Sequence, residues 1–425
     1  MKIDTNGTAT LPDRDRDLDL DRVRAATLGA AHGWPFYLAD LGRLRANIAG
    51  LQSALAATVM KREVGYSFKT NYLAAFITEA RSRGVAAEVV SELEFDYALD
   101  LGYSGSKVVV NGPVKSPRFL ARCLRMGAVV NVDSMEELRA VADLGASGAA
   151  QVGIRVPAGV RGARSRFGID TDDPATRAEV RRMLATRAVQ IDGIHCHTSV
   201  ARSAESFGAR LRTIAETFDS LRPGVRPDFL DVGGGMMSAV PEDIALQLSF
   251  PVETYADYAE ALGHELHSFY GNDQPRLIVE PGMGLLADTM SLYAPVISVK
   301  RGASHTVAVV MASVLDVKPL RGAIEPSIRV VRANGEGSGE AAPGVELTGN
   351  TCMEIDVLHN ALEVTGPPLR AGDILEIRNV GAYSISLRPN FIEPAPAVLA
   401  LGPEPEVLRP RMTAADFGHL YGRRP

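Results

Sequence analysis

The fold follows from the stretch Val64-Gly65-Tyr66-Ser67-Phe68-Lys69-Thr70-Asn71, a short run of β-type residues that ends in a lysine. Large residues alternate with small ones along it, which predicts a strand with Lys69 at its carboxyl end. Seven more β-rich runs follow, and helix-patterned segments separate them. These runs begin near Ala86, Lys107, Ala128, Gln151, Val189, Asp228 and Leu277.

Eight strands that alternate with helices favour a closed parallel barrel, because parallel strands need crossover connections. We therefore predict an α/β protein in which residues 46–290 form a (β/α)8 TIM barrel. Function-bearing residues at the strand ends also favour closure. An open doubly wound sheet is the structural alternative.

The sequence pattern changes after Pro281, where β-type runs follow one another without long helices between them. This pattern predicts an antiparallel β-domain over residues 291–402. We expect residues 25–45, with a strand near Phe36, to join that domain, because the barrel already has eight strands. Residues 1–24 should be a flexible lead-in and residues 403–425 a tail with room for one short helix. The predicted strands of the β-domain are 296–299, 306–311, 328–331, 374–377 and 382–387, and the Gly-rich segment 333–340 is expected to be a mobile loop.

Composition narrows the class of protein. Charged residues make up 23% and hydrophobic residues 46%, which is ordinary for a soluble globular protein. The net charge of −6, without a basic block, argues against a nucleic-acid or membrane-surface partner. The three cysteines are too few for a disulfide framework and have no metal-site spacing. No signal peptide and no membrane-length apolar run is visible, so a cytoplasmic location is expected.

Polar residues and glycines follow the predicted strands at their carboxyl ends, which meet on one rim of a barrel. Three successive glycines let the backbone approach a ligand, and loops after the last two strands of such barrels commonly hold phosphate. The strand-end segments are Lys69, Glu88 to Ser91, His195 to Ser199, Asp231 to Gly235 and Glu280 to Met283.

Each of these features also has a plainer explanation. Lys69 fits a solvated strand end, the glycines fit a tight turn, Glu280 fits a rim charge and His197 fits a core histidine. Together, however, an amine, an imidazole, a glycine turn and a carboxylate are the parts that hold pyridoxal phosphate. Its aldehyde requires a lysine and its pyridinium an acidic partner.

The chain resembles the alanine-racemase-type, or fold-type III, pyridoxal-phosphate enzymes. Within them it is most similar to the decarboxylase branch that contains diaminopimelate and ornithine decarboxylases. The likeness runs from about Pro35 to about Phe391 and rests on nine motifs in the family's order. They are Tyr66-Ser-Phe-Lys-Thr-Asn71, Glu88-Val-Val-Ser91, Val132-Asp-Ser134, Arg166-Phe-Gly168, His195-Cys-His197, Asp231-Val-Gly-Gly-Gly235, Glu280-Pro-Gly282, Cys352-Met-Glu-Ile-Asp356 and Gly381-Ala-Tyr383.

The resemblance implies a pyridoxal 5′-phosphate-dependent decarboxylase that forms a homodimer with shared active sites. Lys69 would form the Schiff base, and Cys352 of the partner subunit would protonate the carbanion after CO2 leaves. Arg166 and Asp356 match a charged pair that spans the dimer interface in this family. Cofactor contacts are implied for Lys69, Glu88, His197, Ser199, Gly233, Gly234, Gly235, Glu280, Gly282, Met283 and Tyr383.

Four departures from the family pattern concern the ligands. Met283 replaces an arginine that contacts phosphate or substrate carboxylate, and Ser199-Val200 replaces Gly-Ser. Met353 replaces the acidic residue that grips a distal ammonium, which a thioether cannot do. Lys318-Pro-Leu-Arg321 replaces the Arg-Pro segment of the diaminopimelate enzymes, so Lys318 and Arg321 are candidate carboxylate contacts.

These departures predict a non-standard α-amino acid as substrate. Lysine, ornithine and diaminopimelate should be poor substrates unless Glu354 reaches the distal ammonium. A racemase or epimerase on the same fold is an alternative, although Cys352 stands where a racemase uses a tyrosine. The second alternative is a catalytically silent homologue that only binds a ligand.

Overall fold

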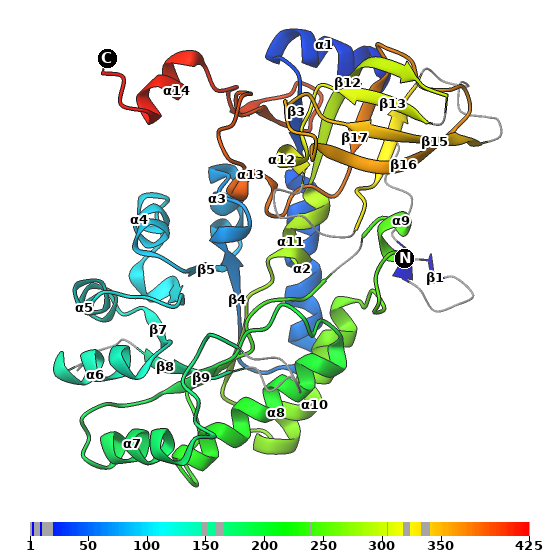
Figure 1. Ribbon diagram of the computed structural model, residues 1–425. Coiled ribbons are helices and arrows are strands. Elements are labelled where there is room, and N and C mark those ends of the chain that lie inside the picture. Colours follow the sequence, from blue (N-terminus) through cyan, green and yellow to red (C-terminus); the bar gives the residue numbers. More distant parts are fainter. Residues whose placement is uncertain are drawn as a thin grey trace. The chain divides into compact units, whose positions relative to one another are not determined.

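The computed structural model describes residues 2–3, 9–10, 20–145, 151–157, 165–237, 240–303, 305–317, 324–332 and 341–424. The chain divides into two compact units (Figure 1). One unit comprises Arg45–Ser238 and Val252–Leu285, and the other comprises Met1–Leu44, Ala239–Pro251 and Leu286–Pro425. No helix among the described residues combines the length and apolar character needed to cross a membrane.

The first unit is a closed barrel of eight parallel strands, which confirms the predicted (β/α)8 fold and excludes the open sheet. Neighbouring strands follow the order β10-β11-β4-β5-β6-β7-β8-β9. The sixth strand begins at Gly193 rather than near Val189. Just before it, the Val152 N–H donates to the Asp192 carboxylate, and regular pairing with β8 starts only at Gly193. The strands are β4 (Arg62–Ser67), β5 (Ala86–Val89), β6 (Val108–Val110), β7 (Val129–Val132), β8 (Gln151–Arg155), β9 (Gly193–His195), β10 (Phe229–Asp231) and β11 (Arg276–Val279).

Helices follow the barrel strands closely because capping residues start them. Ser91, Ser134 and Ser203 each accept a backbone N–H three residues ahead, which satisfies a donor that the first helical turn leaves open. In Figure 1, α4 to α7 lie outside the cyan and green strands. The helices are α2 (Leu41–Thr58), α3 (Ala74–Ser82), α4 (Glu92–Asp100), α5 (Pro117–Arg125), α6 (Met135–Asp143), α7 (Pro174–Ala185), α8 (Ala204–Leu221), α10 (Tyr255–Tyr270) and α11 (Met283–Leu286).

The barrel interior changes from apolar to polar along the strands. Phe229, at the start of β10, fills the interior with its ring and packs with Val109, Val129 and Ile278. Gly153 and Gly193 make room for that ring, since a Cβ at either would lie within 2.8 Å of it. The carboxyl ends of the strands, in contrast, carry buried charged and amide side chains. The packed half therefore supports a polar half, as expected for a barrel whose chemistry lies at one rim.

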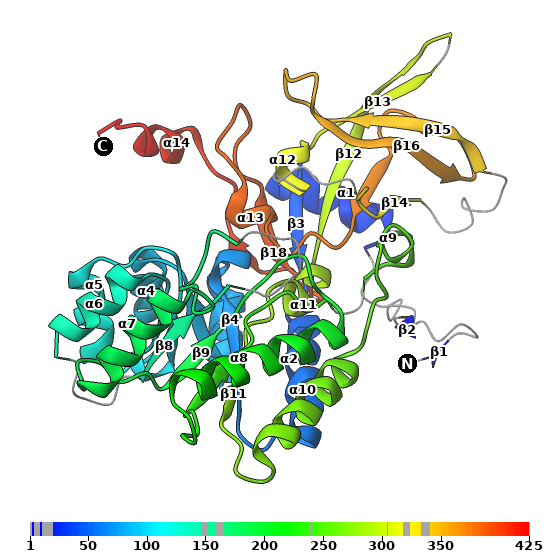
Figure 2. The same cartoon turned by 60° about the horizontal axis from the view of Figure 1, so that its bottom comes forward.

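The second unit is a mostly antiparallel β-sheet. Its order is β16-β15-β13-β12-β3-β18-β19, and β17 pairs with β12 and β14. Figure 2 shows the long strand β12 beside β13. Two pairs, β3 with β18 and β13 with β15, are parallel and depart from the predicted pattern. The strands are β3 (Phe36–Ala39), β12 (Met290–Arg301), β13 (Thr306–Val310), β14 (Ile328–Val331), β15 (Ala341–Thr348), β16 (Val357–Thr365), β17 (Ile374–Ile377), β18 (Ala397–Ala400) and β19 (Val407–Arg409).

One predicted strand of this unit is wrong. Residues 382–387 contain the short helix α13 (Ser384–Leu387) instead of a strand. Tyr383 has a left-handed backbone (φ +64°), and the Ser384 hydroxyl donates to the Val380 carbonyl. Both features turn the chain before a strand can form. The predicted loop 333–340 lies outside the described residues.

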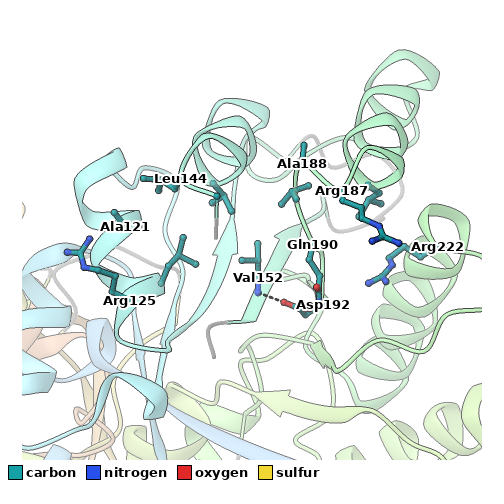
Figure 3. A pocket seen from close by; sticks show the side chains of 14 residues that line it. Ala121, Arg125, Leu144, Val152, Arg187, Ala188, Gln190, Asp192 and Arg222 are labelled. Carbon is teal, nitrogen blue, oxygen red and sulfur yellow. Dashed lines mark hydrogen bonds between the residues drawn. The ribbon is translucent and has the colours of Figure 1, made fainter. Parts of the chain in front are cut away.

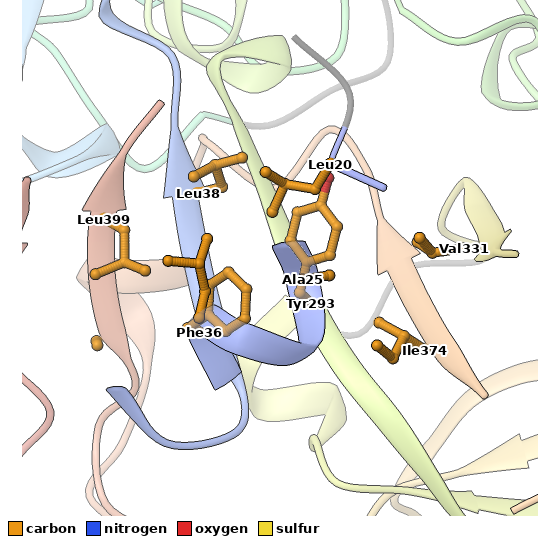
Figure 4. Packing of buried hydrophobic residues seen from close by; sticks show 10 residues of the cluster. Leu20, Ala25, Phe36, Leu38, Tyr293, Val331, Ile374 and Leu399 are labelled. Carbon is orange, nitrogen blue, oxygen red and sulfur yellow. The ribbon is translucent and has the colours of Figure 1, made fainter. Parts of the chain in front are cut away.

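A hydrophobic core of the second unit packs around the side chains of β3 (Figure 4). The rings of Phe36 and Tyr293 stack with centroids 5.3 Å apart. Leu20 is buried in the same cluster and α1 (Arg22–His32) begins at Arg22, so residues 20–24 are not the flexible lead-in that the sequence suggested. In the expected tail, β19 pairs with β18, and the short helix α14 (Ala414–Leu420) follows it.

Candidate active site

The amine of Lys69 lies at the rim of the barrel, paired with a buried carboxylate. Lys69 is in a short 3-10 turn directly after β4, and its side chain is 33% exposed. Its Nζ lies 2.5 Å from Glu88 Oε2, which also accepts from Ser67 Oγ at 2.7 Å. The lysine is therefore oriented by its neighbours and still reachable from outside.

A chain of buried polar side chains extends from this pair across the barrel. Asn111 Nδ2 donates to Glu88 Oε1 at 3.0 Å and to Glu280 Oε1 at 2.6 Å. Asn131 Nδ2 donates to Asn111 Oδ1 at 2.9 Å and to Asp231 Oδ2 at 3.1 Å. These residues come from different strands or strand ends, so closing the barrel assembles them into one network.

Glu280 is the ionised member of this network. Burial and the charge of Glu280 raise the pKa of Asp231 well above its usual range. Burial would also raise the pKa of Glu280, but hydrogen bonds and charge from His195, Lys69 and Asp231 outweigh it and hold that pKa well below its usual range. Asp231 therefore retains a proton in preference to Glu280.

His197 lies against the glycine turn as a neutral ring. The Gly234 N–H donates to His197 Nδ1 at 2.9 Å. Burial, followed by the charge of Lys69, lowers the pKa of His197 to about 3. A neutral, flat imidazole thus lies on the rim beside the lysine's charge.

The glycine turn needs glycine for steric reasons. A Cβ at Gly234 would lie 2.4 Å from the Glu280 carbonyl oxygen, and Gly235 has φ +106°. The Gly233 N–H donates to Asp231 Oδ1 at 2.9 Å, so two of the three N–H groups are already used within the chain. Within the described part of the chain, the Gly235 N–H has no acceptor and can serve a ligand.

A buried arginine holds the turn from behind. The Arg210 guanidinium donates to the Val232 carbonyl at 2.6 Å and to the Gly234 and Ala201 carbonyls at 3.0 Å. Its Cζ atom also lies 4.2 Å from the Phe207 ring centroid. With its carbonyls engaged on that side, the turn has a fixed conformation.

The structure brings other expected barrel residues to the same rim. Gly282 is buried, and a Cβ there would lie 2.4 Å from Thr70 Oγ1. Met283 starts α11 and is partly exposed, and Ser199 is exposed on the loop after β9.

The expected residues of the second unit lie on two loops. Cys352 is exposed, Glu354 is exposed and Met353 is partly buried, all between β15 and β16. Tyr383 is partly exposed before α13. Lys318 and Arg321 lie outside the described residues.

Asp356 fixes the loop that carries Cys352. Its Oδ1 accepts from Ser313 Oγ and the Val314 N–H, and its Oδ2 accepts from Thr351. Both oxygens are thus engaged within the chain. Arg166, its expected partner across an interface, lies 4.1 Å from the Phe167 ring centroid.

Comparison with known proteins shows the family of the chain. Residues 41–287, more than half of the chain, match the family described as "Pyridoxal-dependent decarboxylase, pyridoxal binding domain". The chain belongs to the pyridoxal-dependent decarboxylases. It is thus an amino-acid carboxy-lyase whose cofactor is pyridoxal 5′-phosphate.

Relatives of this decarboxylase span nearly all of its length. It is 27% identical over 409 residues to the diaminopimelate decarboxylase of Methanothermobacter thermautotrophicus, covering 92% of each chain. It is 26% identical over 403 residues to that of Bacillus subtilis, covering 90% of each. The same fold occurs in the crystal structure of M. jannaschii diaminopimelate decarboxylase with L-lysine (TM-score 0.82, 23% identity, 95% of each chain covered). It also occurs in Paramecium bursaria Chlorella virus arginine decarboxylase bound to agmatine (TM-score 0.70, 20% identity, 84% of this chain and 94% of that chain covered).

The donor set of this decarboxylase suits its cofactor. A reachable amine suits the aldehyde, an ionised buried carboxylate suits a pyridinium nitrogen, and a glycine cradle that a Cβ would fill suits a phosphate. Lys69, Glu280, His197 and Gly235 are therefore the residues that would hold it.

Sequence reasoning missed part of the network of the decarboxylase. Asn111 follows the third strand and Asn131 is the penultimate residue of the fourth, where the same strand-end rule applies. Arg210 and Arg202 lie in and before α8, and no sequence pattern marks them.

A cavity of about 990 Å³ in the decarboxylase lies elsewhere (Figure 3). Its lining includes Val152 and Gln190, near the amino ends of β8 and β9, and Arg222 at the end of α8. Lys69 lies at the carboxyl end of its strand. The cavity therefore belongs to the opposite end of the barrel from the polar network.

Proposed function

We propose that this decarboxylase removes CO2 from a non-standard α-amino acid in an active site shared by two subunits. The observation that carries the assignment is the hydrogen-bonded network from the Lys69 amine to the Glu280 carboxyl group. The Lys69 amine is the group that would hold the cofactor through its aldehyde. When bound, the cofactor supplies an electron-accepting ring that takes up the electron pair released as CO2 leaves.

The residues around Lys69 have distinct roles in the proposal. Glu280, as a carboxylate, would hold a proton on the ring nitrogen of the cofactor, and Asn111 fixes the position of that carboxylate. His197, held as a neutral ring, would pack against the cofactor and exclude water from it. Glu88 accepts a hydrogen bond from the Lys69 amine and aims it at the rim.

Cys352 of the partner subunit is the proposed proton donor. The Cα–carboxylate bond breaks, CO2 departs, and the thiol proton is delivered to Cα; solvent then reprotonates the thiolate. Burial raises the pKa of Cys123 to about 12 and of Cys196 to about 11, so neither is a reactive thiol at neutral pH. Cys352 is exposed on a loop fixed by Asp356.

The substrate side of the proposal rests on Met353. A partly buried thioether beside Cys352 offers no charge to a distal ammonium, and Glu354 beside it is exposed. We therefore expect a substrate whose side chain ends in a neutral or apolar group.

A panel of amino acids tests the proposal. CO2 and amine release should be at least about tenfold slower with lysine, ornithine and diaminopimelate than with the preferred substrate. The reason is that no carboxylate forms an ion pair with the distal ammonium group of these three amino acids. Met353→Glu should raise the rates with the diamino acids. Efficient diaminopimelate turnover by the wild type contradicts the substrate proposal. Deuterium exchange at Cα without CO2 release points to the racemase instead.

A further inference from the structure

Arg202 places its guanidinium on the glycine turn. It lies in the loop after β9, directly before Ser203, which caps α8. Its Nη1 is 3.4 Å from the Gly235 carbonyl oxygen and 3.6 Å from Met283 Sδ. The loops after three consecutive barrel strands, β9, β10 and β11, thus meet at this one cation.

The backbone of Arg202 is fixed from the neighbouring helix. The hydroxyl of Tyr258, a buried residue of α10, donates to the Arg202 carbonyl at 2.6 Å. The same hydroxyl accepts from the Met237 N–H at 3.3 Å, two residues beyond the glycine turn. Tyr258 therefore ties the arginine's loop and the glycine turn to one anchor.

An anion at this turn needs a cation. Two of the three glycine N–H groups are already donated to His197 and Asp231, so the turn alone offers one donor. A phosphate carries a charge of about −1.5 to −2 and several acceptor oxygens. Met283, where the resemblance leads us to expect an arginine, cannot neutralise it, whereas a guanidinium fork matches phosphate geometry.

We propose that Arg202 binds the phosphate of the cofactor and takes over the role of the arginine that is absent at position 283. This inference rests on the proposed function, in which the glycine turn is the phosphate site. The cation reaches the same place from the loop after β9 instead of the loop after β11. In this arrangement Met283 contacts Arg202, and Arg202 contacts the phosphate.

Binding of two ligands that differ only in the phosphate tests the proposal. Pyridoxal 5′-phosphate and pyridoxal are titrated against the wild type and Arg202→Met by equilibrium dialysis. Loss of a charge-assisted contact should weaken binding of the phosphorylated form at least about tenfold and change pyridoxal binding less than about twofold. Adding Met283→Arg to the Arg202→Met variant should recover most of the lost affinity.

A matched control is Arg212→Met, which removes an arginine of α8 that pairs with Glu265. It should bind both ligands as the wild type does. The proposal is overturned if Arg202→Met binds the phosphorylated form normally, loses both ligands equally, or is not rescued by Met283→Arg. A wild type that binds both ligands equally weakly refutes the proposed function itself.

Discussion

Glu280 shows what one side chain requires to stay charged inside a barrel. It is buried, yet Asn111 donates to one oxygen at 2.6 Å and His195 Nε2 lies 3.7 Å from the other. Asp231 takes the proton that burial forces onto one of the two carboxyls. The residue that tunes the cofactor site is therefore inseparable from partners on other strands.

The lowered pKa of His197 makes the stability of the folded protein depend on pH. The folded pKa of about 3 lies below the usual value of about 6.5, so between these values the unfolded chain binds a proton that the folded chain does not. This contribution to the free energy of unfolding is complete above pH 6.5 and is lost as the pH falls toward 3. At pH 5 the loss should be about 2 kcal/mol.

Urea unfolding at pH 7 and pH 5 measures this loss. His197→Asn should lose less stability on acidification than the wild type, whereas His419→Asn, at an exposed site of α14, should match the wild type. An equal pH dependence in the wild type and His197→Asn would mean that His197 is not held neutral.

Some residues of the site could be predicted from the sequence, and others could not. Lys69, Glu280 and the glycines could be found because they follow strands on one rim. Asn111 and Asn131 could not be assigned a role, because an amide next to a run of valines shows no sign of the carboxylates that it will bridge. Arg202 needs three loops to meet, which only the closed barrel provides.

The glycine turn is the element whose shape the cofactor site depends on. Gly234→Ala would place a Cβ 2.4 Å from the Glu280 backbone carbonyl, which has no room to yield. We expect cofactor affinity to fall at least about tenfold, because a shift of the turn also displaces the Gly235 N–H.

Gly224→Ala is the control for the turn. Gly224 has φ +71° with open space around its Cβ position, so the change adds only local backbone strain. Its cofactor titration should match the wild type. Equal affinities for Gly234→Ala and the wild type would show that the turn does not contact the cofactor.

Elements also show where periodicity misleads. Residues 382–387 alternate as a strand does, but the left-handed Tyr383 and the Ser384 hydroxyl turn them into α13. The eight barrel strands were predictable because a helix-patterned segment separates each strand from the next, and because the first five strands recur at a nearly constant spacing. The parallel pairing of β3 with β18 joins segments far apart in the chain, which no local pattern encodes.

At the scale of the whole molecule, the proposal requires two chains for each active site. Lys69→Ala and Cys352→Ala should each be nearly inactive as pure proteins. Unfolded together in equal amounts and refolded, they should recover about a quarter of the wild-type activity, because half of the dimers pair one chain of each kind and restore one site. Activity that does not rise on mixing would place both residues in the same subunit's site.

The central claim is an imine between Lys69 and pyridoxal phosphate. Borohydride reduction of the holoenzyme, followed by proteolysis and mass spectrometry, tests it most directly. We predict one phosphopyridoxyl group on the peptide that contains Lys69. A group on another lysine, or an unmodified protein after incubation with the cofactor, would contradict the account.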